Sequence, residues 1–310
     1  MKKVLFATTA LIATAGVASA DIGISGDGRM GIVNTEATGN SDNETQFNSR
    51  IRITFTASGT TDAGIEFGGS IRADNAAATS NPVALTDANG DGTIDATGGG
   101  INGQAGSVYV SGDFGKITMG DVGSAHESAT GDLAGVGYTM SKNEMGYAGG
   151  GDDEGVAWSY SVDNLTLYAS MGQPQASSAN NESGFGLSYS MAGVTLGVGT
   201  ADDGTREETS ASIRASVAGV GITAIIIDRD NDAAVSGETG LSLTYAVDSN
   251  LSVAAFTRST ENVGAADRDY TGVGFSMNLG GGATLAGGYT QGGGGSNSLD
   301  AMDLGLKFAF

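Results

Sequence analysis

The sequence predicts an all-β protein, a closed antiparallel barrel of sixteen strands that crosses a membrane, with short periplasmic turns and long outer loops. Three observations support this fold. Short segments of alternating polarity run through most of the chain, the connections between them alternate in length, and glycine contributes 53 of the 310 residues. Each glycine inside a helix destabilises it by roughly 1 kcal/mol relative to alanine, so the composition disfavours a helical bundle.

The first twenty residues have the layout of a cleaved signal peptide. Lys2 and Lys3 form a basic start, residues 4–17 are apolar, and Ala18-Ser19-Ala20 is a small-residue cleavage site. The apolar stretch is short for a helix that spans a bilayer, and no later stretch is longer. We therefore expect export, with removal of residues 1–20 and a barrel domain over 21–310. A retained membrane anchor is the alternative.

The expected strands have one apolar face and one polar or small-residue face. In the last segment, apolar residues occupy every second position from Met302 to Phe310, and Asp303 and Lys307 lie between them. Successive side chains of a strand point to opposite faces, so this pattern separates a lipid face from a wet face. Residues 225–227 are three consecutive isoleucines, whose facing the pattern does not assign. The sixteen expected strands are 22–34, 47–58, 63–74, 104–112, 115–122, 155–162, 164–172, 184–191, 193–202, 208–218, 221–229, 238–247, 250–260, 269–280, 283–291 and 299–310.

The connections between these strands form two classes. The short turns are rich in Gly, Asp and Asn, and lie at 59–62, 113–114, 163, 192, 219–220, 248–249 and 281–282. The others are mostly longer and polar, at 35–46, 75–103, 123–154, 173–183, 203–207, 230–237, 261–268 and 292–298. Short turns on one rim and long loops on the other are typical of an outer-membrane barrel. A soluble sandwich is the alternative, but sixteen strands exceed what a single open sheet usually holds.

The charge pattern excludes some functions and suggests others. Lys and Arg number 14 against 35 Asp and Glu, a net charge of −21, which disfavours a nucleic-acid partner. Without cysteine, disulfides and thiolate metal sites are impossible. The scarce arginines lie on wet faces, because lipid-facing arginines cost roughly 2–4 kcal/mol each at mid-membrane. Those expected in the lumen are Arg29, Arg50, Arg52, Arg72, Arg214 and Arg258.

The first four of these arginines are expected to form a basic wall on the first three strands. Solvated arginines, or pairs with Asp27, Glu66 and Asp74 on the same wall, are the alternative. Glycines on wet faces are expected to leave room for water, as at Gly197, Gly199, Gly272 and Gly274.

The 123–154 loop is too long for a simple connector, and loops of this length are usually functional or disordered. It is acidic, with Glu127, Asp132 and Glu144 among its carboxylates and Lys142 as its one lysine. If the loop folds into the barrel, these carboxylates face the arginine wall. Such a charged constriction filters solutes by size and charge.

Several segments resemble the alphaproteobacterial, Rhodobacter-type general porins of the Gram-negative outer membrane. They are the 18–20 cleavage site, the expected mature start at 21–31, the 131–137 stretch and the terminal Phe310. The resemblance covers essentially the whole mature chain and implies a trimer of 16-stranded barrels, each with its third loop folded inward. It also implies a basic wall of Arg29, Arg50, Arg52 and Arg72, and an acidic side of Glu127, Asp132 and Glu144. Phe310 corresponds to the C-terminal aromatic residue that the barrel-assembly machinery recognises. The 75–103 loop is longer than the family leads us to expect.

The 75–103 loop contains a spacing typical of calcium loops. Asp87, Asn89, Asp91, Thr93 and Asp95 place oxygen atoms at alternate positions, with Gly92 at the sixth. Position twelve is a glycine, so the usual bidentate glutamate is missing. We expect weak Ca²⁺ binding, and a polar turn with fortuitous acids is the alternative.

These features predict a general diffusion porin that passively conducts ions and small hydrophilic solutes, without catalysis and with a preference for cations. Its expected partners are two further copies of itself, outer-membrane lipid and lipopolysaccharide. A substrate-selective channel of the same fold is the first alternative. A β-barrel enzyme is disfavoured, because His126 is the only histidine and no Ser/His/Asp set is evident. A secreted calcium-binding adhesin is the third alternative.

Overall fold

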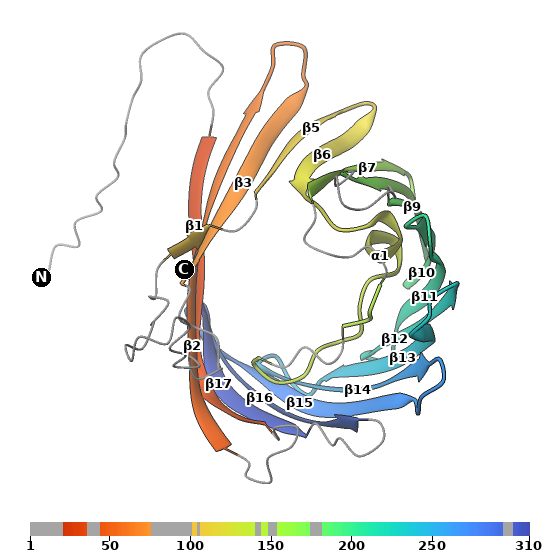
Figure 1. Cartoon of the computed structure of the whole chain (residues 1–310). Coiled ribbons are helices and arrows are strands. Elements are labelled where there is room, and N and C mark those ends of the chain that lie inside the picture. The colour runs from red at the N-terminus through yellow and green to blue at the C-terminus, as the bar shows by residue number, and fades with distance from the viewer. Residues whose placement is uncertain are drawn as a thin grey trace, which may run out of the picture.

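The strands form one antiparallel barrel around an open lumen (Figure 1). The computed structural model describes residues 21–35, 44–75, 101–103, 106–139, 144–147, 154–173, 182–293 and 300–310. Strands that are neighbours around the ring are antiparallel, and the first strand, β1 (Asp21–Thr35), pairs with both β2 (Glu44–Thr60) and the last strand, β17 (Ala301–Ala309), which closes the ring. The predicted signal peptide at 1–20 and the predicted calcium loop at 87–95 lie outside the described residues.

In the part of the chain that the structure describes, seventeen strand segments make sixteen barrel strands, because the short β4 and β5 both pair with β3 and together occupy one position in the ring. The strand predicted at 104–112 is observed from residue 107 to residue 112, and residues 104 and 105 lie outside the described part of the chain. The segments are β1 (Asp21–Thr35), β2 (Glu44–Thr60), β3 (Glu66–Asn75), β4 (Ile101–Gly103), β5 (Ser107–Gly112), β6 (Gly115–Asp121), β7 (Glu154–Val162), β8 (Leu165–Gly172), β9 (Ser183–Met191), β10 (Val194–Asp202), β11 (Glu207–Val217), β12 (Val220–Asp230), β13 (Val235–Ala246), β14 (Leu251–Asn262), β15 (Arg268–Gly280), β16 (Ala283–Gly293) and β17 (Ala301–Ala309).

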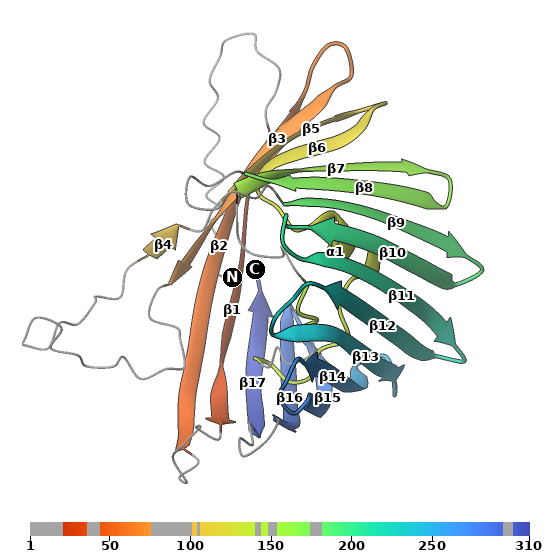
Figure 2. The same ribbon diagram turned by 45° about the vertical axis from the view of Figure 1, so that its right-hand side comes forward.

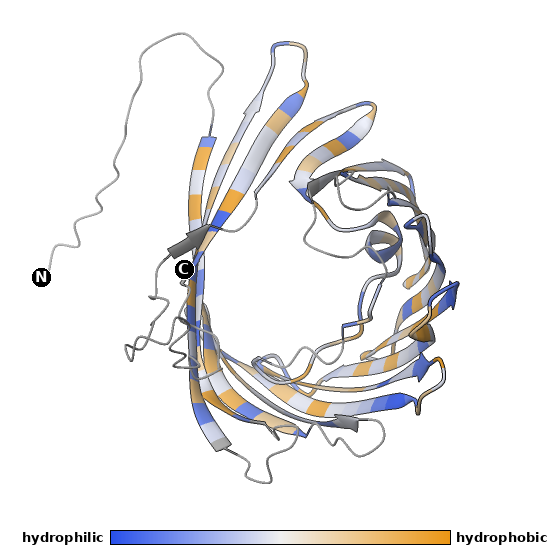
Figure 3. Ribbon diagram, viewed as in Figure 1, coloured by the Kyte–Doolittle hydropathy of each residue, from blue (hydrophilic) through white to orange (hydrophobic). Residues whose placement is uncertain are grey.

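The alternation of polarity along each strand separates the two faces of the barrel (Figure 3). Ile32, Leu243 and Leu304 are among many large apolar side chains exposed on the outer face, where lipid would cover them. The structure also assigns the isoleucine run. Ile226 is 53% exposed on the outer face, whereas Ile225 and Ile227 are 3% and 2% exposed and point inward. The inner face is therefore not wet along its whole length.

The short turns have the backbone that tight hairpins require. Asp163, Ala192 and Ala218 have φ near +50°, and Gly193 and Gly219 follow two of them with φ near +80°. Two successive residues with positive φ match the right-handed twist of the flanking strands. The turn predicted at 59–62 lies at 61–65 instead, because pairing between β2 and β3 continues to Thr60 and Glu66.

One short helix, α1 (Ala125–Thr130), follows β6 and lies inside the ring beside β8 to β11 (Figures 1 and 2). The chain continues inside the barrel through residues 131–139 and 144–147. We call residues 122–139 and 144–147 the inner segment. In the described part of the chain, no helix is long and apolar enough to cross a membrane.

Candidate pore constriction

Glycines on the lumen wall let the inner segment approach very closely. A Cβ atom added to Gly197 would lie 2.2 Å from the Ala129 carbonyl oxygen, and one added to Gly199 would lie 2.5 Å from His126. A Cβ on Gly274 would lie 2.8 Å from the Gly137 nitrogen. The expectation that these glycines leave room for water is wrong at these three positions. They leave room for the backbone of the inner segment.

An apolar cluster fixes the middle of the inner segment. Leu133, Val136 and Met145 are buried against inward-facing residues of the wall, including Ile225, Ile227, Phe256 and Tyr270. Burial of one large aliphatic side chain stabilises a contact by roughly 1.5–3 kcal/mol. Several such side chains hold the inner segment to β12–β15 without any charge.

Polar side chains of the wall satisfy backbone groups of the inner segment. The Asp303 carboxylate, on β17, accepts hydrogen bonds from the backbone nitrogens of Tyr138 at 3.0 Å and Thr139 at 2.6 Å, and from the Thr139 hydroxyl at 2.7 Å. The Ser242 hydroxyl accepts from the Ala134 nitrogen at 2.8 Å, and the Ser170 hydroxyl from the Ala125 nitrogen at 2.8 Å. The inner segment is thus bonded to the wall at both ends and in the middle.

The four predicted arginines occupy one wall, with acids among them. The Arg52 guanidinium lies 2.9 Å from the Asp27 carboxylate, and Arg50 lies 3.3 Å from the same carboxylate. Arg72 pairs with Asp74 at 2.7 Å. The alternative of pairing on the same wall therefore holds for three of the four arginines, although a single Asp27 serves both Arg50 and Arg52.

Arg29 lies between two other cations. On neighbouring strands it is paired in register with Arg50 on one side and Lys307 on the other. Its guanidinium carbon lies 5.8 Å from the centre of the Tyr138 ring, in a cation–π contact. The Tyr138 hydroxyl lies 3.1 Å from both the side-chain and the backbone oxygen of Asn48, on β2. The inner segment therefore reaches across the lumen to the basic wall.

The predicted acidic residues lie within electrostatic range of one another on the inner segment. Burial raises the pKa of the Glu127 carboxyl, and the Asp132 and Glu144 carboxylates raise it further, while His126 lowers it. Burial also raises the pKa of Asp132, against the lowering effect of the hydrogen bond from the Met145 nitrogen and of Arg258. These two carboxyls therefore lose their charge at a higher pH than free carboxyls do.

Two arginines predicted to line the lumen hold the inner segment instead. Arg214 donates to the carbonyl oxygens of Thr130 at 3.1 Å and Ala129 at 3.2 Å, at the C-terminal end of α1. Arg258 donates to the Glu144 carbonyl oxygen and lies over the Tyr270 ring, 4.9 Å from its centre. Their periodicity predicted the inward direction but not the carbonyl groups that meet them.

Sequence reasoning missed Tyr138, which came from no motif. Alternation along the last strand placed Asp303 and Lys307 on its wet face. It did not predict the hydrogen bonds of Asp303 to residues 138 and 139, or the position of Lys307 beside Arg29.

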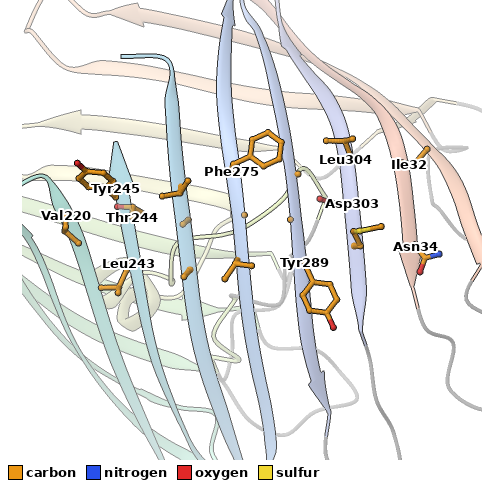
Figure 4. Close-up of a pocket in the computed structure, with 18 of the residues that line it drawn as sticks. Ile32, Asn34, Val220, Leu243, Thr244, Tyr245, Phe275, Tyr289, Asp303 and Leu304 are labelled. Carbon is orange, nitrogen blue, oxygen red and sulfur yellow. The ribbon is translucent and has the colours of Figure 1, made fainter. Parts of the chain in front are cut away.

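A large apolar hollow lies on the outside of the barrel, across β12–β17 and β1 (Figure 4). Leu243, Phe275 and Leu304 line it, and its few polar atoms offer little to a hydrophilic solute. This surface suits lipid or another apolar partner. The polar route through the molecule is the lumen.

A closed barrel with a lipid-type outer face, and a lumen narrowed by an inward segment, defines an outer-membrane channel protein. Residues 7–310 match the family of Gram-negative porins, and the chain belongs to that family. It is 29% identical, over 94% of its length and 100% of the relative, to a porin of Rhodobacter capsulatus.

Solved structures agree with this assignment. A porin structure with 26% identity superimposes with a TM-score of 0.72, and covers 94% of this chain and 100% of its own. A triple mutant of Rhodopseudomonas blastica porin, 22% identical with the same coverage, gives a TM-score of 0.70 and supports the fold alone. The predicted sixteen-stranded barrel with an inward third loop is thus confirmed.

Proposed function

We propose that this chain is a general diffusion porin that lets ions and small hydrophilic solutes pass through a charged constriction. The main support for the proposal is that the inner segment is attached on two sides of the lumen. Its helix α1 packs against β8–β11, and its Tyr138 hydroxyl donates to Asn48 on β2. A pore narrowed by a fixed segment sorts solutes by size.

In this proposal, charges of opposite sign line the two sides of the narrowing. Arg29, Arg50 and Arg52 lie on the wall, and Glu127 and Asp132 lie on the inner segment. Fixed charges facing one another across a narrow opening create a transverse field, which orients dipolar solutes and disfavours apolar ones. This arrangement supports a filter that acts on polarity as well as size.

The net charge of −21 supports a preference for cations, because fixed negative charge concentrates cations at the pore mouth. We also propose that the chain assembles as a homotrimer in the outer membrane, in contact with lipid and lipopolysaccharide. The exposed apolar outer face is suited to both lipid and neighbouring subunits.

Recording from purified protein in a planar bilayer tests the proposal. We expect stepwise conductance with a reversal potential that favours cations in a salt gradient. Changing Glu127 to Gln together with Asp132 to Asn should move the reversal potential towards anions. The matched control is Glu261→Gln, which removes a carboxylate from the exposed outer face of β14 and should leave selectivity nearly unchanged. Absence of stepwise conductance would rule out a pore.

A further inference from the structure

A polar recess of about 240 Å³ lies in the lumen wall, between α1 and the rim of short turns. It is formed where β10 and β12 begin and where β11 and β13 end, and α1 packs against β10 and β11 beside it (Figure 2). This volume corresponds to about eight water molecules at roughly 30 Å³ each, which suits a solute of about three or four carbon atoms.

The recess has one charged side chain, with hydroxyl groups on both sides of it. Arg214, on β11, is paired in register with Thr195 on β10 and Thr223 on β12. Thr223 is in turn paired with Ser242 on β13. Arg214 and Ser242 both hydrogen-bond the inner segment, so this row faces the lumen. Paired residues have Cβ atoms roughly 4.5–5.5 Å apart, so a solute beside the guanidinium also lies within reach of hydroxyl groups.

A second row, nearer the rim, keeps the recess open. Ser216 on β11 and Thr244 on β13 are both paired in register with Gly221 on β12. A Cβ atom at Gly221 would overlap the Thr244 hydroxyl, so a larger residue at this position would fill part of the recess. Gly221 therefore leaves the two hydroxyl groups beside an open floor.

Much of the hydrogen-bonding capacity of this lining is unused. A guanidinium has five N–H donors, and Arg214 donates to two carbonyl oxygens at the C-terminal end of α1. Among the described residues, its other donors have no acceptor, and the hydroxyl groups of Thr223 and Thr244 make no hydrogen bond. The Thr195 hydroxyl, by contrast, is bonded to that of Ser190 at 2.8 Å. A solute can therefore bind Arg214, Thr223 and Thr244 without breaking a bond of the protein.

The charge of the recess indicates the kind of solute. Within the described part of the chain, its lining contains no acidic residue and Arg214 forms no ion pair. Guanidinium groups bind carboxylates through charge-assisted hydrogen bonds, which are roughly twice as strong as neutral ones. Threonine hydroxyls both donate and accept, as the hydroxyl groups of a solute do. One cation among several hydroxyl groups thus fits a solute that carries one carboxylate and at least one hydroxyl.

We infer that this recess is a binding site for small hydroxycarboxylates. Arg214 binds the carboxylate, and Thr223 and Thr244 bind the hydroxyl groups. The net charge of −21 repels anions from the pore, so the recess raises the occupancy of one class of anion that the pore otherwise disfavours. The role of the site in transport rests on the proposed function, but binding can be measured without conductance.

Saturation-transfer NMR on the full chain, refolded in detergent micelles, measures this binding. The probes are glycerate, which has both kinds of group, glycerol, which lacks the carboxylate, and propionate, which lacks the hydroxyls. Salt at about 0.15 M screens the net charge of the protein. We expect glycerate to bind at least about tenfold more tightly than glycerol and several-fold more tightly than propionate.

Variants separate the two parts of the site. Arg214→Gln should reduce glycerate binding to the level of glycerol. Because Arg214 also holds α1, the double variant Thr223→Val with Thr244→Val tests the site with those bonds in place. It should weaken glycerate binding to the level of propionate and leave propionate binding unchanged. The matched control is Thr239→Val, on the exposed outer face of β13, which should change neither.

Two results would overturn the inference. One is equal affinity for glycerate and propionate in the unaltered chain. The other is unchanged glycerate binding in the double valine variant. Planar-bilayer recording of the same preparations separates the site from the pore. Conductance without glycerate binding would count against the site alone, whereas glycerate binding to a protein that does not conduct would support the site and count against the pore.

Discussion

Replacing Asp303 by alanine should release the far end of the inner segment and leave the barrel intact. The side chain is 3% exposed and accepts from two backbone nitrogens and one hydroxyl of residues 138 and 139. A hydrogen bond to a charged group contributes about 1.5–3 kcal/mol to stability. The losses of the three hydrogen bonds to this one carboxylate do not simply add. We therefore expect local docking of these residues to weaken by about 2–4 kcal/mol.

Amide hydrogen exchange measures this loss directly, because exchange at a bonded amide requires local opening. A weakening of about 2–4 kcal/mol corresponds to exchange roughly 30 to 1,000 times faster at residues 138 and 139. Asp303→Asn, which keeps one acceptor oxygen, should be intermediate. Asp269→Asn, an exposed change on β15, is the control and should leave exchange at both positions unchanged. Unaltered exchange in a folded Asp303→Ala barrel would show that the carboxylate does not hold the segment.

Three further changes test other parts of the structure. Gly199→Leu should displace α1, because even the Cβ of the new side chain would lie 2.5 Å from His126. The displacement would be measured as faster amide hydrogen exchange in α1 with unchanged exchange in the barrel strands. The control is Gly28→Ala, whose Cβ would meet nothing closer than 3.4 Å. Lowering the pH should reduce the preference for cations, because the raised pKa of Glu127 and Asp132 makes the inner segment lose negative charge at a higher pH than free carboxyls do. A reversal potential that changes only in the pH range in which free carboxyls titrate would contradict this. Asp87→Asn combined with Asp91→Asn should abolish weak Ca²⁺ binding in calorimetry, and equal heats of binding before and after the change would refute the predicted site.

The fold was accessible from the sequence because each strand carries its own signal. Alternate apolar residues on β17 separate two faces without reference to any other part of the chain. Where this local signal fails, as at residues 225–227, only the docked Leu133 and Met145 explain why two isoleucines point inward.

The candidate site was less accessible, because its contacts join distant positions. Tyr138 meets Asp303 across 165 residues, and no spacing pattern connects them. The direction of Arg214 was predictable, but its carbonyl partners depend on the exact position of α1. Glycine is ambiguous in the same way, because the sequence around Gly197 gives the same pattern whether water or a helix lies beside that residue in the fold.

The pairing of β1 with β17 has a consequence for the kinetics of folding. Asp27 and Ala309 are directly paired, although they lie near opposite ends of the chain. Bringing such distant strands together is slow, because the chain loses the entropy of closing a very long loop before strand pairing can stabilise the product. Every intermediate that lacks this seam exposes two unpaired strand edges, which invite pairing with other chains. A chain truncated before β17 should therefore aggregate or be degraded, and the seam makes completion of the last strand a condition for a single, closed product.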